Sequence, residues 1–331
     1  MSDASLPLED ALILSLAGCL PPTRNTRLAI GDDAAAITLP DGNLLLVTTD
    51  MLMEDVHFRL SWDDLPALGW KALAQNLSDI AAMGGTPTHA VIAIALPAAW
   101  APHNAQALYR GIATLAAQAE VDVIGGDTIR SAGPLTLTLT VLGRVSPNEL
   151  LTRRGARPGD ALYVTGTLGR AAAGLRVLED GRPIPDDLAA AVDAQLRPQP
   201  RLVAARAIAS SRLATAMMDL SDGLATDLHR LCRASSVGAV VDGDAVPVDP
   251  VVAACCRWAA NAPGDPLALA LTGGEDFELL IAAPPAAAAA LHTLLAPLPL
   301  TRIGECTAAP EVQLRRGAQL APLAWGFTHF T

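Results

Sequence analysis

The chain has 331 residues, of which 51% are hydrophobic and 17% are charged. This composition supplies a sizeable core, and the length is enough for two domains. The formal net charge of -11 argues against nucleic acid and anionic membranes as partners, because both are bound by clustered Lys and Arg. An acidic protein can still bind phosphates through metal ions.

Targeting signals and membrane spans are not evident. The opening residues, MSDASLPLED, lack the basic segment of a secretory signal, and prolines or histidines interrupt the longest apolar stretches. We therefore expect a cytoplasmic location. The five cysteines form no CxxC pair, which favours reduced thiols over zinc sites or disulfides.

Lys71 is the only lysine in the chain, and it lies in GWKALAQ, not after a glycine loop. The sequence therefore contains neither a GxxxxGK[ST] P-loop nor the VAIK lysine of protein kinases. If the protein binds ATP, it must do so with arginines, backbone amides and metal ions.

The first half of the chain alternates helical and strand patterns. A helix is expected over residues 5–18, with Leu8, Leu12 and Leu16 at a spacing of four. The remaining expected elements are strands over 27–30, 34–39 and 43–49, a helix over 64–83, a strand over 88–95, a helix over 103–119, and strands over 121–124 and 135–145. The last of these, LTLTLTVLGRV, alternates strictly and predicts a strand with one buried face.

A domain boundary is expected near residue 148. Residues 146–160 contain prolines and glycines and show no helix or strand period, as in an interdomain connection. Beyond them, strands and helices again alternate, so we expect an α/β or α+β fold with domains over 1–148 and 149–331. VTGTLGRAAAGL does not match GxGxxG, so a dinucleotide fingerprint is given little weight.

Carboxylates recur where apolar strands are expected to end: LAIGDD, LLLVTTD, VIGGD and TAMMD place Asp32, Asp33, Asp50, Asp127 and Asp219 there. One such Asp is common turn chemistry, but ligand sites in α/β proteins form at strand ends. Asp79 adds a carboxylate to an otherwise apolar helix, KALAQNLSDIAAMGG. These oxygen ligands suit Mg²⁺ bound together with a phosphorylated ligand.

Two further stretches have more than one interpretation. In MMDLSDGLATDL, Ser221 and Asp222 could simply cap a helix, which leaves Asp219 unexplained, or the three could hold a metal or phosphate. In LTGGEDFELL, the glycines after a Leu/Ala strand could form a hairpin turn with Glu275 and Asp276 exposed.

Eight motifs in order resemble those of the thiamine-monophosphate kinase family, and they cover residues 30–330. They are GDDAAAI, TTDMLMEDVHF, KALAQNLSDIAAMGGTP, VIGGDT, LTRRGARPGD, MMDLSDGLATDL, LTGGEDFELL and GFTHF. That family is grouped with aminoimidazole ribonucleotide synthetase and selenophosphate synthetase. The resemblance implies a two-domain synthetase-like fold, in which an N-terminal mixed-sheet domain binds ATP and Mg²⁺ and forms a homodimer, and a C-terminal α/β domain covers it.

The resemblance also implies the site residues. For several Mg²⁺ ions it implies Asp33, Thr48, Thr49, Asp50, Asp79, Asp127, Asp219 and Asp222, of which Asp50, Asp219 and Asp222 would be catalytic. For ATP it implies Gly126, Asp127, Arg153 and Ser221. For the thiamine end of the substrate it implies His57, Glu275 and Phe327. Asp55 stands where that family often has glycine, and Phe327 stands where tyrosine is common.

The implied reaction converts ATP and thiamine monophosphate into ADP and thiamine diphosphate. The attacking phosphate is already largely anionic, since the second pKa of a phosphomonoester is about 6, so no general base is required. We expect direct in-line transfer assisted by Mg²⁺, without a phosphoenzyme. The alternatives are another ATP-dependent synthetase of the same superfamily, or a non-catalytic module that binds Mg²⁺ and nucleotide.

Overall fold

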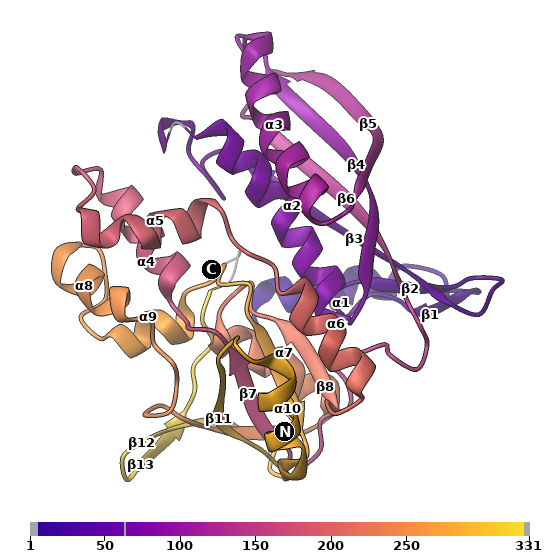
Figure 1. The fold of residues 1–331 in the computed structure, drawn as a ribbon, viewed down its shortest axis with the longest axis vertical. Coiled ribbons are helices and arrows are strands. Elements are labelled where there is room, and N and C mark those ends of the chain that lie inside the picture. The colour runs from indigo at the N-terminus through magenta and orange to yellow at the C-terminus, as the bar shows by residue number, and fades with distance from the viewer. Residues whose placement is uncertain (1–5, 63, 328–331) are drawn as a thin grey trace.

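The computed structural model describes residues 6–62 and 64–327. In this part of the chain the strands form two sheets, drawn from successive halves of the sequence (Figure 1). The six-stranded sheet has the order β1-β2-β3-β6-β4-β5, and the seven-stranded sheet has the order β13-β12-β9-β11-β7-β10-β8. Both are mixed, because β4 and β5 are parallel in the first and β9 and β12 are parallel in the second.

The first half contains the strands of the six-stranded sheet and the helices that cover one of its faces. Its elements are α1 (Leu8–Gly18), β1 (Thr26–Leu28), β2 (Ala35–Thr38), β3 (Leu44–Met53), η1 (Leu60–Trp62), α2 (Leu65–Ala82), β4 (Thr86–Pro97), α3 (Pro102–Gln118), β5 (Asp122–Ser131) and β6 (Thr136–Val145). Helices α2 and α3 lie on the same side of the sheet in Figure 1, and their apolar residues form one core with β3, β4 and β6.

The second half builds a sheet with helices on both faces. Its elements are β7 (Ala161–Thr165), α4 (Arg170–Asp180), η2 (Asp186–Leu188), α5 (Ala189–Leu196), α6 (Leu202–Ser211), β8 (Ala216–Asp219), α7 (Leu224–Ser235), β9 (Gly238–Asp242), α8 (Pro250–Trp258), α9 (Pro266–Thr272), β10 (Leu279–Ala283), η3 (Pro285–Ala287), α10 (Ala288–Leu295), β11 (Leu300–Thr307), β12 (Val312–Arg316) and β13 (Gln319–Pro322). Core residues of α7 and α9 pack on one face, and those of α6 and α10 pack on the other.

Three expectations about elements were wrong. Strand β3 continues through Asp50 because it pairs with β6 along its whole length, and β5 continues through Asp127 because it pairs with β4. Residues 266–272, expected as a strand before LTGGEDFELL, form helix α9, since Asp265 accepts a hydrogen bond from the Leu267 amide and Pro266 opens the first turn.

The helix expected over 5–18 is observed from Leu8 onward, and residue 5 lies outside the described residues. Its leucines at a spacing of four, Leu8, Leu12 and Leu16, are exposed, whereas Asp10 is buried. Among the described helices, none combines the length and the apolar character needed to cross a bilayer.

Helices α2 and α3 cross at a pair of glycines. A Cβ on Gly111 would lie 1.7 Å from the Pro66 carbonyl oxygen, and one on Gly69 would lie 2.0 Å from the Leu108 carbonyl oxygen. No side chain fits at that separation, so glycine at both positions sets how closely the two helices approach.

Replacing Gly111 with alanine should therefore force α3 away from α2. We expect Gly111→Ala to lower the free energy of unfolding by about 1–3 kcal/mol, as overpacked cores do. Urea denaturation of the purified protein measures this. Gly264→Ala is the matched control, because a Cβ at Gly264 meets no atom within 4 Å; equal stability of the two variants would contradict the tight crossing.

Candidate functional site

Helix α2 carries one polar stripe through an otherwise apolar environment. Lys71, Gln75, Ser78 and Asp79 follow one another at positions i, i+4, i+7 and i+8, which share one face of a helix. The helix packs against β3 and β6 of the first sheet and against β8 of the second. Its polar stripe therefore faces the junction of the two halves of the chain.

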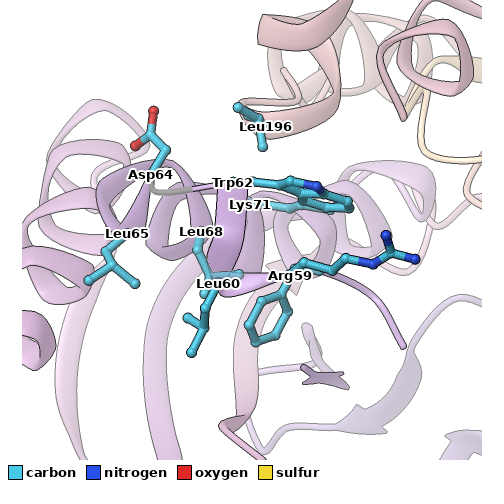
Figure 2. A pocket seen from close by; sticks show the side chains of 9 residues that line it. Arg59, Leu60, Trp62, Asp64, Leu65, Leu68, Lys71 and Leu196 are labelled. Carbon is cyan, nitrogen blue, oxygen red and sulfur yellow. The ribbon is translucent and has the colours of Figure 1, made fainter. Parts of the chain in front are cut away.

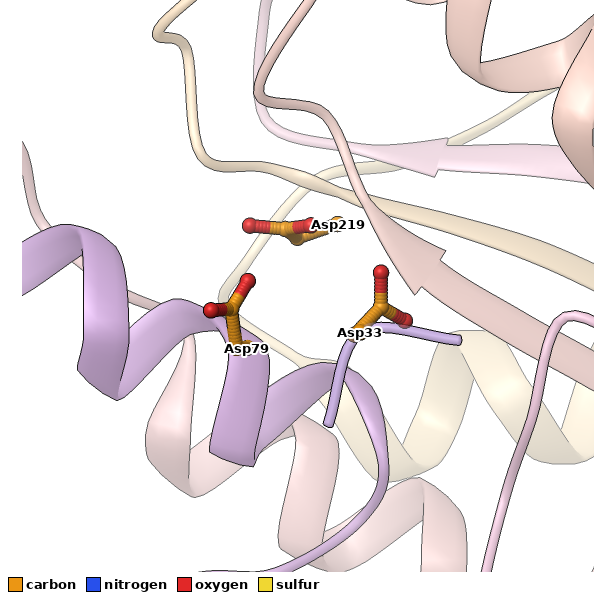
Figure 3. A group of neighbouring side chains, drawn as sticks. All are labelled: Asp33, Asp79 and Asp219. Carbon is orange, nitrogen blue, oxygen red and sulfur yellow. The ribbon is translucent and has the colours of Figure 1, made fainter. Parts of the chain in front are cut away.

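Three of the carboxylates predicted as metal ligands meet at this junction. Asp33 comes from the loop between β1 and β2, Asp79 from α2 and Asp219 from the end of β8 (Figure 3). One oxygen from each lies within 4.8 Å of the others. Residues far apart in sequence thus form a single acidic cluster, which is the geometry needed to hold a divalent cation with oxygen ligands.

Hydrogen bonds fix the orientation of the acidic cluster. The Thr48 hydroxyl donates to Asp79 at 2.5 Å, and the Ser78 hydroxyl donates to Asp219 at 2.6 Å. The Arg153 guanidinium donates through Nε to Asp33 Oδ1 at 3.0 Å. The second oxygen, Asp33 Oδ2, is buried and has no hydrogen-bond partner among the described residues. A bound cation would satisfy it, so the donor set fits a metal.

Burial raises the pKa values of these carboxyl groups. Desolvation is the largest cause for Asp219, whose pKa is raised to about 7, with the charge of Asp33 adding to the effect. Desolvation likewise raises the pKa of Asp79 well above its usual range, with Asp50 and Asp219 as neighbouring charges. It raises the pKa of Asp50 to about 6 and that of Asp32 to about 7. Without a cation, the site therefore holds protons.

A cavity of about 630 Å³ opens beside the acidic cluster and is lined by residues of both halves of the chain. Its volume is in the range of small-molecule sites. Eight of the residues implied by the family resemblance line it: Thr49, Asp50, His57, Asp79, Ser221, Asp222, Glu275 and Phe327. The cavity thus joins the carboxylates expected to bind metal to the residues expected at the thiamine end.

Ser221 does not cap helix α7, contrary to one interpretation of its motif. The helix begins at Leu224, and Gly223 precedes it without a side-chain cap. The Ser221 carbonyl instead accepts a hydrogen bond from the Glu275 amide at 2.7 Å. A Cβ on Gly274 would lie 2.4 Å from that carbonyl oxygen, so the loops SDG and TGGE approach backbone to backbone, and residues 273–274 form no exposed hairpin turn.

Asp222 is held by charge. The Arg230 guanidinium forms an ion pair with Asp222 and lies 3.4 Å from Asp227. The Asp222 amide donates to Asp227 at 3.0 Å. Asp227 and Arg230 therefore orient a carboxylate that lines the cavity.

The residues implied for the thiamine end lie along one wall of the cavity. His57 accepts a hydrogen bond from the Met53 amide through Nδ1 at 3.1 Å. Phe327 is 48% exposed, and its carbonyl accepts from Thr226. The rest of the GFTHF motif, residues 328–330, lies outside the described residues. Asp55 has a φ of 64°, the left-handed conformation that glycine adopts most easily and that Asp tolerates.

Gly126 and Asp127 are not near the acidic cluster of their own chain. Asp127 pairs in register with Ala93, which pairs with Thr138, which pairs with Met51. Three strand spacings, about 14 Å, therefore separate its backbone from β3. Side chains alternate along a strand, so Asp127 shares the open face of the sheet with Met51, while Asp50 points to the opposite face.

Four side chains of the site were not predicted as functional. They are Lys71, Ser78, Gln195 and Arg230. The polar stripe on α2 was a usable signal for Lys71 and Ser78, because both fall at helical spacing from Asp79. No local pattern distinguishes Gln195 or Arg230, which reach the site only through the packing of α5 and α7.

Comparison with known proteins agrees with this architecture. Residues 31–145 match the family described as AIR synthase related protein, N-terminal domain, and residues 157–317 match its C-terminal domain. The solved structure of AaThiL complexed with AMPPCP and TMP superposes with a TM-score of 0.84 at 29% identity, covering 99% of this chain and all of the other. The fold and site thus define a two-domain protein of the AIR synthase-related class.

Full-length relatives narrow the class to one family. Thiamine-monophosphate kinase of Escherichia coli K12 is 38% identical, with 92% of this chain and 93% of the relative aligned. The enzyme of the same name from Synechococcus elongatus is also 38% identical, over all of this chain and 99% of the relative. The chain belongs to the thiamine-monophosphate kinase family.

The raised pKa values predict how stability depends on pH when metal is removed. Asp32, Asp50 and Asp219 have folded pKa values of about 6 to 7, above the ordinary value of 3.8, so the folded state binds protons more tightly than the unfolded state. In EDTA, the free energy of unfolding should fall as the pH rises from about 4 to about 7, by up to about 1.4 kcal/mol per pH unit for each group.

Urea denaturation across this pH range measures the slope. Asp219→Asn removes one titrating group and should make the slope shallower, whereas Asp193→Asn, an exposed control, should not. Stability that rises through this range in EDTA would contradict the buried acidic cluster.

Proposed function

We infer that this chain transfers the γ-phosphoryl group of ATP to thiamine monophosphate, which yields thiamine diphosphate and ADP. The observation that carries this conclusion is its full-length similarity to thiamine-monophosphate kinases. The related structure complexed with AMPPCP, an ATP analogue, and TMP supports the pairing of a nucleotide with this acceptor.

We propose Mg²⁺ as the cation of the acidic cluster. Asp33, Asp79 and Asp219 would hold it, and Asp50 and Asp222 at the cavity wall would hold further ions, with Thr48 and Thr49 nearby. The chemistry that Mg²⁺ supplies when bound is neutralisation of the phosphate charges that otherwise keep ATP and the acceptor phosphate apart. The buried, unpartnered Asp33 Oδ2 supports this proposal.

The chain's own residues would position the two phosphate groups. Ser221 lines the cavity and Arg153 lies against Asp33, so we propose that both contact ATP. We propose Asp50, Asp219 and Asp222 as the catalytic carboxylates, and His57, Glu275 and Phe327 as contacts to the thiamine end. Since the acceptor phosphate is already anionic, no side chain has to remove a proton from it.

We further propose that the active enzyme is a homodimer in the cytoplasm, built on an N-terminal domain of residues 1–148 with a C-terminal domain of 149–331. The open face of the first sheet exposes Met51 and Ile129, at 53% and 56%, on either side of its strands. A second copy of the chain covering this face would bury both and bring its cavity toward Gly126 and Asp127 of the first copy. In that arrangement these two residues serve ATP and Mg²⁺ across the dimer.

The activity is tested by ADP release with different acceptors. Thiamine monophosphate should support turnover and yield thiamine diphosphate, whereas an aminoimidazole precursor and selenide should not. Asp222→Asn should lower kcat about 100-fold or more, because it removes a charge at the phosphates. Asp242→Asn, which changes an exposed ion pair with Arg315, is the control and should leave kcat unchanged.

The same assay separates the alternatives. Turnover with another acceptor, or Mg-ATP binding without turnover, would contradict the proposed reaction. Radiolabel on the protein after incubation with γ-labelled ATP would contradict direct transfer.

The shared site is tested by mixing inactive variants. Co-expressed Asp127→Asn and Asp219→Asn chains should recover about a quarter of wild-type activity, because half of the dimers are mixed and each mixed dimer has one intact site. Asp79→Asn mixed with Asp219→Asn is the control and should recover none, since both residues belong to the cluster of one chain. No recovery with the first pair would place Asp127 outside the site of the partner.

A further inference from the structure

Lys71, the only lysine, is buried at the edge of the candidate site. Its side chain is 3% exposed, and Nζ lies 2.7 Å from Glu275 Oε1. A buried ammonium group is costly unless an anion compensates it, so this pair is a defined contact between α2 and the TGGE loop. The acidic cluster described above does not include Lys71.

Glu275 is held from two sides. Its second oxygen, Oε2, accepts a hydrogen bond from Gln195 Nε2 on α5. Its backbone has a φ of 68°, a strained conformation for a non-glycine residue that surrounding contacts must maintain. Donors on α2 and α5 therefore fix both oxygens of one carboxylate whose side chain is still 26% exposed.

Lys71 does not line the 630 Å³ cavity, whereas Glu275 and Gln195 do. Lys71 instead borders a separate recess of about 20 Å³ with Arg59, Trp62, Leu68 and Leu196 (Figure 2). This recess holds no more than about one water molecule. Lys71 thus reaches the ligand cavity only through Glu275.

We propose that Lys71 is a positioning residue that holds Glu275 ready for the organic end of the acceptor substrate. The proposal rests on the proposed function, in which that end is thiamine, with a cationic thiazolium ring and an aminopyrimidine. An ionised carboxylate has about four acceptor sites, and Lys71 and Gln195 occupy two of them. The remaining sites can face the cavity, where a cation or an amino group would meet them.

The ammonium group also separates Glu275 from the carboxylates that bind metal. Asp50, Asp79 and Asp222 line the same cavity, and a further uncompensated carboxylate would attract a divalent cation. With Lys71 against it, Glu275 forms a neutral pair. One end of the cavity thereby stays available for metal and phosphate, and the other for the organic group.

The test is the steady-state kinetics of Lys71→Met, Glu275→Gln and the double variant. Each single variant should raise the KM for thiamine monophosphate by about tenfold to a hundredfold, the effect of losing a hydrogen bond to a charged group. The KM for ATP should stay within about twofold and kcat within about threefold, since the metal end is unchanged. The double variant should be no worse than the worse single variant, because both changes disrupt one interaction.

Protein folding is controlled in two ways. Lys71→Met leaves Glu275 without its cation and can unfold the protein, whereas the double variant pairs two neutral side chains and should keep the native melting temperature. Arg206→Met is the matched control: it removes another cation that joins the two halves of the chain, through Glu149, but does not line the cavity. It should leave both KM values unchanged.

The outcomes distinguish this proposal from the proposed function. If the wild-type enzyme does not turn over thiamine monophosphate, the function itself is wrong. If the wild-type enzyme is active and the Lys71→Met or double variant keeps a wild-type KM for thiamine monophosphate, or loses affinity equally for ATP, the positioning role is wrong.

Discussion

Mutual repulsion among buried carboxylates is the constraint on which the rest of this structure depends. Asp33, Asp79 and Asp219 approach within 4.8 Å of one another in a setting where charges are poorly screened. Such a cluster persists only if protons or cations compensate it, and both kinds of compensation are present: raised pKa values on Asp79 and Asp219, and the Arg153 guanidinium on Asp33. A divalent ion would replace both, so a folded chain with this cluster is already organised for metal.

Helix α2 converts that constraint into a fixed geometry. It packs on both sheets, and the glycine crossing with α3 holds it against the first. Thr48 and Ser78 then tie Asp79 and Asp219 to neighbouring elements through hydroxyl donors. Because ligands on regular elements are held more precisely than ligands on loops, the helix can present Lys71 and Asp79 to opposite ends of one cavity with little rearrangement.

The sequence was sufficient for the family, the two-domain α/β expectation and the acidic cluster, because these depend on patterns that are local or ordered along the chain. It was insufficient where pairing decides: β3 and β5 extend past Asp50 and Asp127 because their neighbours β6 and β4 do. The role of Ser221 depends on a second loop, 273–275, which no reading of residues 216–231 alone could supply. Lys71 was noted only for what it excluded, since its partner Glu275 lies some two hundred positions away.

The cations of the site differ in kind, and the difference follows from what each must do. Arg153 and Arg230 pair with Asp33 and Asp222, both proposed to bind metal, so each guanidinium has to leave its carboxylate when a metal ion arrives. A planar group with several donors can then turn to phosphate oxygens, which links metal binding to nucleotide binding. Lys71 faces no such exchange: its carboxylate is proposed to meet the organic group, and a buried, single-point ammonium suits a contact that stays in place throughout turnover.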